Sequence, residues 1–235
     1  MKMQAIPILF EDTNLIVLNK PAGIAVHGGP NVKGITVVDF LVRHFPEVKS
    51  VGDDPVRPGI VHRLDKDTSG IMVVARNPDA FGELKSLFKE RRIEKTYLAV
   101  VCGRPKSRVG IISYSIGRDA KNPTRRGAGG GRAKIRGERE AETNYRVLRT
   151  GGAYSLLEVT PKTGRTHQIR VHLKAIGYPI ACDRVYGGKN VCCPEGAGRQ
   201  MLHAQSLSFS FPEGRRIKFE ADPPDDFILA MEKIL

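Results

Sequence analysis

The chain has 235 residues, of which 40% are hydrophobic and 27% are charged, a composition typical of a soluble globular protein with a proper core. No stretch approaches the roughly 20 apolar residues of a membrane span. The amino end, residues 1–8, is too short for a secretion signal and is too soon followed by Glu11 and Asp12. We therefore expect no membrane association and a cytoplasmic location.

The formal net charge of +13 indicates which kind of partner the protein binds. Such a surface attracts phosphate backbones and releases their counterions on binding. Nucleic acid is the leading predicted partner. The alternatives are that the excess charge only aids solubility or favours an anionic membrane surface, although no basic amphipathic helix is evident.

The first half of the chain combines a hairpin with two helices. Short apolar runs at 6–10 and 15–19 flank a polar turn and predict the hairpin. Residues 36–45 carry apolar side chains at helical spacing, with Thr36 as the expected cap. The pair Asn77-Pro78 opens a second helix by the cap-plus-proline rule.

The pattern then turns to strands. Alternating or β-branched runs predict them at 96–102, 109–116, 141–149, 153–160 and 201–211. A third helix fits 166–176, because Ile169, Leu173 and Ile176 recur at helical spacing before a glycine. A short terminal helix follows residues 222–225. Beta structure therefore dominates the second half.

The segment from Lys121 to Arg139 is different in kind, because it has almost no apolar residue and many glycines. Such a composition does not pack. We expect a mobile basic loop at about residues 119–139 that orders against RNA phosphates, with an ordinary solvated loop as the alternative. No repeat and no second domain boundary is visible, so a single domain over residues 1–235 is predicted.

The four cysteines are Cys102, Cys182, Cys192 and Cys193. They form no C-x-x-C pair, which argues against a zinc ribbon. Reduced thiols are the expectation. The alternative is that the adjacent Cys192 and Cys193 oxidise, or bind a metal with Cys182 and a histidine.

Residues 57–75 contain several ionisable groups between two segments whose sequence is typical of buried strands. In an extended run Arg63 and Asp65 point to the same face and His62 to the other, because strand side chains alternate. Asp67–Gly70 is turn chemistry. A carboxylate held exposed at such a rim is a candidate nucleophile, while a structural ion pair beside a turn is the alternative.

The string Pro58-Gly-Ile-Val-His-Arg-Leu-Asp-Lys-Asp-Thr-Ser-Gly70 resembles the signature of the RNA pseudouridine synthases, specifically of the RluA-like family. A match of this length is hard to obtain by chance. The resemblance extends over nearly the whole chain. Further matching blocks are Phe10–Gly23, Val26-His27, Lys95-Thr-Tyr97, Thr163–Leu173, Asp183–Gly187 and Met201–Ala204.

The resemblance implies an α+β pseudouridine synthase fold, with a mixed, largely antiparallel sheet, flanking helices and a central cleft. By the same likeness Asp65 is the catalytic aspartate, Tyr97 the active-site tyrosine and Arg165 the basic partner of the carboxylate. Arg63 would contact the RNA backbone or fill the space of the extruded nucleotide.

The implied reaction isomerises specific uridines of ribosomal or transfer RNA and needs no cofactor and no metal. Asp65 would act on the anomeric carbon or on a neighbouring sugar proton, and the sequence does not choose between these routes. The family often carries a small amino-terminal RNA-binding domain. We expect no separate one here, no DNA partner, and a monomer.

Two rival functions use the same residues. A hydrolase built on Ser69, His62 and Asp65 is disfavoured, because G-x-S-x-G is absent and residues this close along a strand face different ways. A non-catalytic RNA-binding module fits the charge but gives Asp65 no function.

The histidines of the motifs are expected to be mostly structural: His62, His167, His172 and His203.

Overall fold

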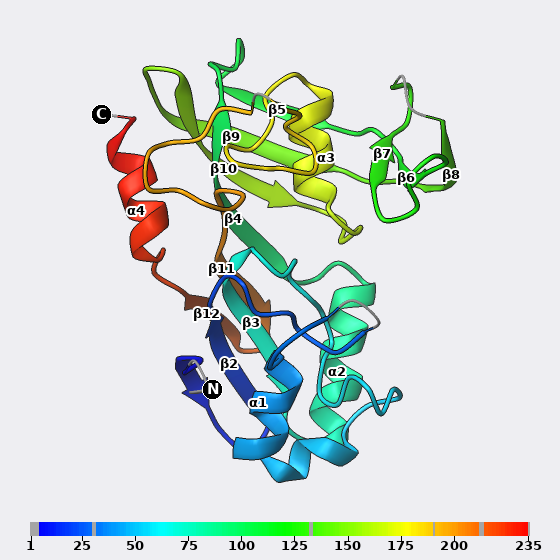
Figure 1. Cartoon of the computed structure of the whole chain (residues 1–235). Helices are drawn as coiled ribbons and strands as arrows, with labels where there is room; N and C mark the ends of the chain where they lie inside the picture. The colour runs from blue at the N-terminus through cyan, green and yellow to red at the C-terminus, as the bar shows by residue number, and fades with distance from the viewer. Residues whose placement is uncertain (1–4, 30–31, 132–133, 190, 212–213, 235) are drawn as a thin grey trace. The chain divides into compact units, whose positions relative to one another are not determined.

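A computed structural model describes residues 5–29, 32–131, 134–189, 191–211 and 214–234 (Figure 1). The chain divides into two compact units. Unit 1 comprises Met1–Glu94 and Ala204–Pro223, and unit 2 comprises Lys95–His203 and Pro224–Leu235. The prediction of one catalytic domain over the whole chain stays a prediction. Within the described ranges, no helix has the length and apolar character needed to cross a membrane.

Unit 1 is built on an antiparallel hairpin, as predicted. Strands β1 (Ile8–Glu11) and β2 (Leu15–Lys20) pair with each other, and β2 pairs with β3 (Ser69–Ala75). The sheet continues from β3 to β11 (Leu202–Ser210), which also pairs with β12 (Arg216–Glu220). All seven residues of β3 are buried, so the strand that follows Asp65 is a core strand.

The helices of unit 1 begin where the sequence places their caps. Helix α1 (Val37–His44) starts with a capping box between Thr36 and Asp39, and a 3-10 turn follows it at Pro46–Ser50. Helix α2 (Pro78–Lys89) starts with the Asn77 side chain accepting from the Ala80 N–H at 2.9 Å. Both predicted helices are confirmed.

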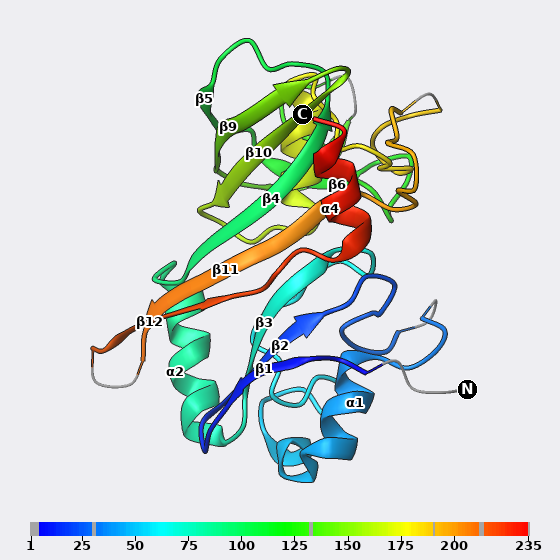
Figure 2. The ribbon, with the colours of Figure 1, turned by 90° about the vertical axis from the view of Figure 1, so that its left-hand side faces the viewer.

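Unit 2 contains a four-stranded antiparallel array with a helix on each face. Figures 1 and 2 show helices α3 and α4 on opposite faces of these strands. The strand order is β4-β10-β9-β5. The elements are β4 (Glu94–Cys102), β5 (Val109–Ile112), β9 (Thr143–Gly151), β10 (Tyr154–Pro161), α3 (Gln168–Ala175) and α4 (Asp225–Glu232).

A small second sheet corrects one expectation. The predicted strand at 109–116 ends at Ile112, and a sheet of order β7-β6-β8 follows it. Its strands are β6 (Ile116–Asp119), β7 (Arg126–Ala128) and β8 (Ile135–Arg139). The expectation that the basic segment does not pack is therefore wrong for its described residues, because backbone pairing needs no apolar side chains. Arg132 and Ala133 lie outside the described residues, and the mobility of the segment stays a prediction.

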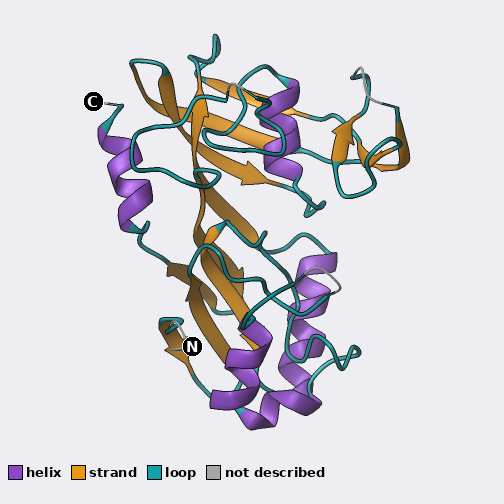
Figure 3. Ribbon diagram, viewed as in Figure 1, coloured by secondary structure: helices purple, strands orange, loops and turns teal. Residues whose placement is uncertain are grey.

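The fold class is confirmed. The chain is α+β, with largely antiparallel sheets flanked by helices (Figure 3). The central cleft stays a prediction.

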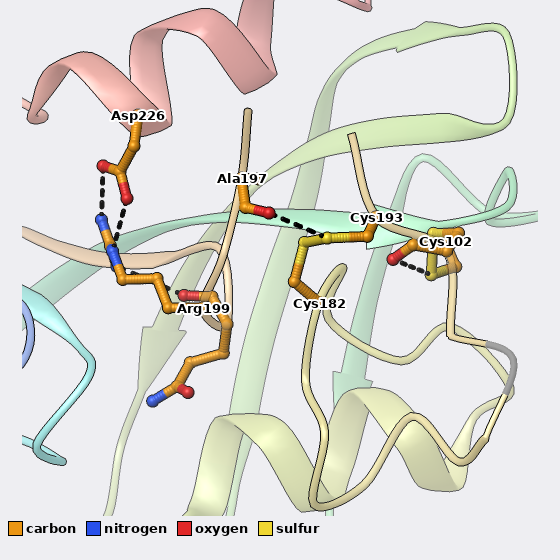
Figure 4. The surroundings of a disulfide bond; sticks show 8 residues. Cys102, Cys182, Cys193, Ala197, Arg199 and Asp226 are labelled. Carbon is orange, nitrogen blue, oxygen red and sulfur yellow. Dashed lines mark hydrogen bonds and ion pairs between the residues drawn. A yellow bond between two sulfur atoms is a disulfide. The ribbon is translucent and has the colours of Figure 1, made fainter. Parts of the chain in front are cut away.

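All four cysteines form disulfides within unit 2, which overturns the expectation of reduced thiols (Figure 4). Cys102 bonds Cys192 across 90 residues of sequence, and Cys182 bonds Cys193 across 11. The Cys182 N–H donates to the Cys192 carbonyl at 2.9 Å, which brings the two segments together. Spacing could not reveal the Cys102–Cys192 bond, because it depends on a contact between segments distant in sequence. With every thiol bonded, the metal-site alternative also fails.

We predict that reduction lowers the free energy of unfolding of unit 2 by about 2–4 kcal/mol, because the long cross-link limits the freedom of the unfolded chain. Guanidinium denaturation with and without dithiothreitol measures this change. The Cys102→Ala variant, which retains the short Cys182–Cys193 loop, should show most of the loss. Four free thiols in the freshly purified protein, or an unchanged denaturation midpoint, would contradict the assignment.

Candidate functional site

The predicted catalytic residue Asp65 lies in a turn immediately before β3. The Thr68 N–H donates to the Asp65 carbonyl at 3.1 Å and closes the turn. Leu64 is buried, Arg63 is exposed and Asp65 is half-buried. The segment is not a strand, so the alternation of faces derived from an extended run stays a prediction. The Asp65 side chain is left accessible beside the core strand.

A buried lysine holds this turn in place. Lys20 is 0% exposed, and its ammonium group donates to the carbonyls of Pro21 (2.8 Å), Ile24 (3.0 Å) and Lys66 (2.9 Å). The Lys66 carbonyl, one residue after Asp65, also accepts from the Gly23 N–H at 3.0 Å. A buried ammonium needs such partners, because burial without them carries a large desolvation cost. The position of the Asp65 turn is thus tied to the end of β2.

The structure shows why the T-S-G motif ends in a glycine, Gly70. Its φ is +118°, and a Cβ there would lie 2.2 Å from the Ala204 carbonyl oxygen. Only glycine allows both this backbone conformation and this approach of β3 to β11. The Asp65 turn therefore enters the sheet at a position that tolerates no side chain.

His62 has the structural role predicted for it. Its Nε2 accepts from the Val73 N–H of β3 at 3.0 Å, and its ring stacks on Phe88 with centroids 4.6 Å apart. The nitrogen that a hydrolase would need as a base is therefore engaged by the backbone. Ser69, the proposed nucleophile of that rival, is 1% exposed. Both observations disfavour the hydrolase.

Arg63 is oriented by His27, which lies in one of the matching blocks but has no role assigned from the sequence. Its guanidinium donates to Nε2 of His27 at 3.0 Å, and Nδ1 of His27 donates to the Gly28 carbonyl at 2.7 Å. Burial of the ring, together with the charges of Arg57 and Arg63, lowers the pKa of His27 below its usual value. A neutral imidazole accepts the arginine hydrogen bond at neutral pH, so the exposed Arg63 is held in a defined orientation.

Tyr97 belongs to unit 2, where it lies on β4 opposite Val159 of β10. It is half-buried and packs against the core of that unit. This position fits a strand tyrosine as well as a stacking platform for a base. Its assignment to the active site stays a prediction.

Arg165, also in unit 2, is held by the turn before α3. Its N–H donates to Oε1 of Gln168 at 3.0 Å, and its Nε donates to the Glu140 carbonyl at 3.1 Å. The 4%-exposed Gln168 also accepts from the Thr163 hydroxyl (2.6 Å) and donates to the Glu142 carbonyl. Gln168 is not among the residues predicted from the sequence, where its one signal is its place inside the arginine motif.

A second buried network anchors α3. Arg170 forms a bidentate ion pair with Asp183, with distances of 2.7 and 2.9 Å. Burial alone would raise the pKa of Asp183, but the hydrogen bonds and charge of Arg170, with two backbone N–H groups, lower it. His172 is fully buried between the Thr143 hydroxyl and the Tyr114 carbonyl, and burial lowers its pKa. It is structural, as predicted.

The predicted site residues thus fall into two groups. Arg63 and Asp65 share one turn of unit 1, while Tyr97 and Arg165 belong to unit 2. The pairing of Asp65 with Arg165 stays a prediction.

Comparison with known proteins identifies the family. Residues 14–175 match the model of the family described as RNA pseudouridylate synthase. The chain belongs to this family. The resemblance inferred from the motifs is therefore confirmed.

Curated relatives are enzymes of the same kind. The chain is 41% identical to the ribosomal large subunit pseudouridine synthase D of Borreliella burgdorferi, covering 95% of this chain and 67% of that protein. It is 40% identical to the protein of the same name from Nitrosomonas europaea, covering 98% and 66%. The chain spans about two thirds of the length of these relatives.

A solved structure supports the fold. Human RNA Pseudouridylate Synthase Domain Containing 1 superposes with a TM-score of 0.75 at 28% identity, covering 95% of this chain and 87% of that one.

We predict that Lys20→Met lowers the free energy of unfolding by about 2–4 kcal/mol, because three buried carbonyls lose their donor. Amide hydrogen exchange at residues 65–68 should accelerate, since the Lys66 carbonyl is released. Lys66→Met is the matched control, because Lys66 is exposed in the same turn. Urea denaturation and exchange mass spectrometry measure both effects. Equal stability and equal exchange in the two variants would contradict the role of Lys20.

Proposed function

We propose that this chain isomerises uridine to pseudouridine in RNA, with Asp65 as the catalytic carboxylate. The observation that carries the proposal is the placement of the family's aspartate motif: Asp65 stands half-buried in a turn that Lys20 fixes to the sheet. A catalytic carboxylate needs both accessibility and a fixed position. The names of the relatives favour large-subunit ribosomal RNA as the substrate, with transfer RNA as the alternative.

The reaction exchanges one bond of the base for another. The bond from N1 of uracil to the anomeric carbon breaks, the base turns, and a bond forms from C5 of uracil to the same carbon. The proton on C5 then leaves, and N1 gains a proton, so the product is an isomer of the substrate. Asp65 acts either as a nucleophile at the anomeric carbon or as a base toward a neighbouring sugar proton.

The other site residues would assist this carboxylate. The Arg165 guanidinium, oriented by the Glu140 carbonyl, would stabilise the negative charge of the carboxylate. The ring of Tyr97 would stack on the displaced uracil. Arg63, exposed and held by His27, would take the place of the extruded nucleotide in the RNA stack.

The cellular setting is part of the proposal. We propose that the protein acts in the cytoplasm, as a monomer and with RNA as its partner, without DNA or a membrane. The net charge of +13 supports an RNA partner. The two disulfides weigh against the cytoplasm, where they are rare outside hyperthermophiles.

We predict that Asp65→Asn lowers pseudouridine formation by at least about 10³-fold, because an amide is a poor nucleophile and a poor base. RNA affinity and thermal stability should stay close to those of the unmodified protein. The control is Asp54→Asn, which removes an exposed carboxylate of the same unit that pairs with Arg57.

The assay uses large-subunit ribosomal RNA and transfer RNA transcribed without modification, with pseudouridine quantified by mass spectrometry of the digested nucleosides. Undiminished formation by Asp65→Asn would overturn the assignment of the carboxylate. Tight binding by the unmodified protein with no pseudouridine in either RNA would favour the non-catalytic binding module.

A further inference from the structure

We propose that the small sheet β7-β6-β8 of unit 2 is a binding site for RNA backbone phosphates, centred on Arg118. The proposal rests on the RNA-modifying function proposed above and specifies which residues hold the substrate strand. It replaces the idea of an unstructured basic loop with a row of arginines on paired strands.

The strand register aligns three arginines. Arg118 on β6 lies directly opposite Arg126 on β7 and opposite Arg136 on β8. Directly opposed residues of antiparallel strands project from the same face, with Cβ atoms about 4.5–5.5 Å apart. Like charges in this arrangement destabilise a sheet. A bound anion would remove that repulsion.

The row lines a cavity of about 680 Å³ that lies entirely within unit 2. Its charged lining consists of five arginines and one aspartate: Arg118, Arg126, Arg136, Arg139, Arg165 and Asp119. The Asp119 carboxylate already accepts from the N–H groups of Lys121 and Asn122. The cavity is therefore strongly positive and is large enough for part of a nucleic-acid strand.

The arginines of the row have no acidic partner among the described residues. Within the part of the chain that the structure describes, Arg118 and Arg136 form no ion pair. The Arg126 guanidinium donates to the carbonyls of Pro123 and Arg125, which are neutral and leave its charge uncompensated. On β9, by contrast, the exposed Arg146 pairs with Glu158 at 3.0 Å. The charges of the row remain available to a ligand.

The sheet is attached firmly to α3. The Tyr186 hydroxyl accepts from the Arg126 N–H at 3.0 Å and shares a hydrogen bond of 2.7 Å with Nδ1 of His167. Ile116 of β6 is buried against Val171 of α3. These contacts position the row before any ligand binds, which reduces the ordering cost of binding.

Phosphate is the ligand that best fits this arrangement. Guanidinium groups bind phosphate oxygens in a bidentate manner, and several in a row suit a repeating anion. Contacts to phosphates fix the position of a strand without reading its sequence. Because Arg165 lines the same cavity, a strand on the row would also pass the residue proposed to assist the carboxylate.

The test compares Arg118→Gln with Arg149→Gln, which removes an exposed arginine of β9 outside the cavity. The probe is a fluorescein-labelled 20-nucleotide oligouridine, and anisotropy is recorded from low to moderate salt. Arg118→Gln should weaken binding about fivefold to tenfold and reduce the slope of log affinity against log salt by about 0.7 to 1. Arg149→Gln should change affinity by less than about twofold.

Stability separates a binding role from a structural one. Arg118→Gln should unfold at the same temperature as the unmodified protein or higher, because it relieves repulsion within the row. If it unfolds earlier, Arg136→Gln on the neighbouring strand takes its place, with the same expected loss of affinity and slope. An affinity and slope equal to those of Arg149→Gln in the variant that folds would overturn the proposal.

The same set of proteins separates this proposal from the proposed function. Loss of affinity in Arg118→Gln with no pseudouridine formed by the unmodified protein would support the phosphate site and refute the enzyme. Pseudouridine formation with unchanged binding by Arg118→Gln would support the enzyme and refute the site.

Discussion

The buried ammonium group of Lys20 is the interaction on which the candidate active site depends. It places a positive charge in the core of unit 1 and compensates that charge with three backbone carbonyls, one of them beside Asp65. The carbonyls come from three positions of the chain, so no one of them can move without leaving a donor unsatisfied. The three hydrogen bonds thereby tie the turn that carries Asp65 to the end of β2.

Unit 2 uses the same principle with a neutral group. The buried Gln168 amide bonds to the turn that carries Arg165 and to the strand beneath it. In both places a polar side chain in the core satisfies backbone groups of the turn that carries a proposed site residue. This arrangement preorganises a site, but it makes the core sensitive to substitution. A buried polar group that loses one of its hydrogen-bond partners lowers the stability of the fold.

Local features of the fold were predictable from the sequence, because their causes are local. The hairpin, the caps at Thr36 and Asn77 and the buried strand after Asp65 all depend on residues within a few positions of each other. The position of Asp65 beside a turn makes it a candidate nucleophile but fits a structural ion pair as well, and only the family resemblance favours the catalytic role. Arg165 is predicted from the resemblance alone.

Features that depend on distant contacts were missed. The role of Lys20 requires a carbonyl 46 residues away, and the Cys102–Cys192 bond spans 90 residues. The basic segment is predicted as a loop because it has almost no apolar residue, although its strands β7 and β8 pair with β6.

The most direct test of the central claim maps pseudouridine across the total RNA of cells that lack this protein. The account predicts that at least one position, in ribosomal RNA by preference, loses its pseudouridine. The modification should return when the unmodified protein is supplied but not when the Asp65→Asn protein is supplied at the same level. An unchanged map, or restoration by the Asp65→Asn protein, would contradict it.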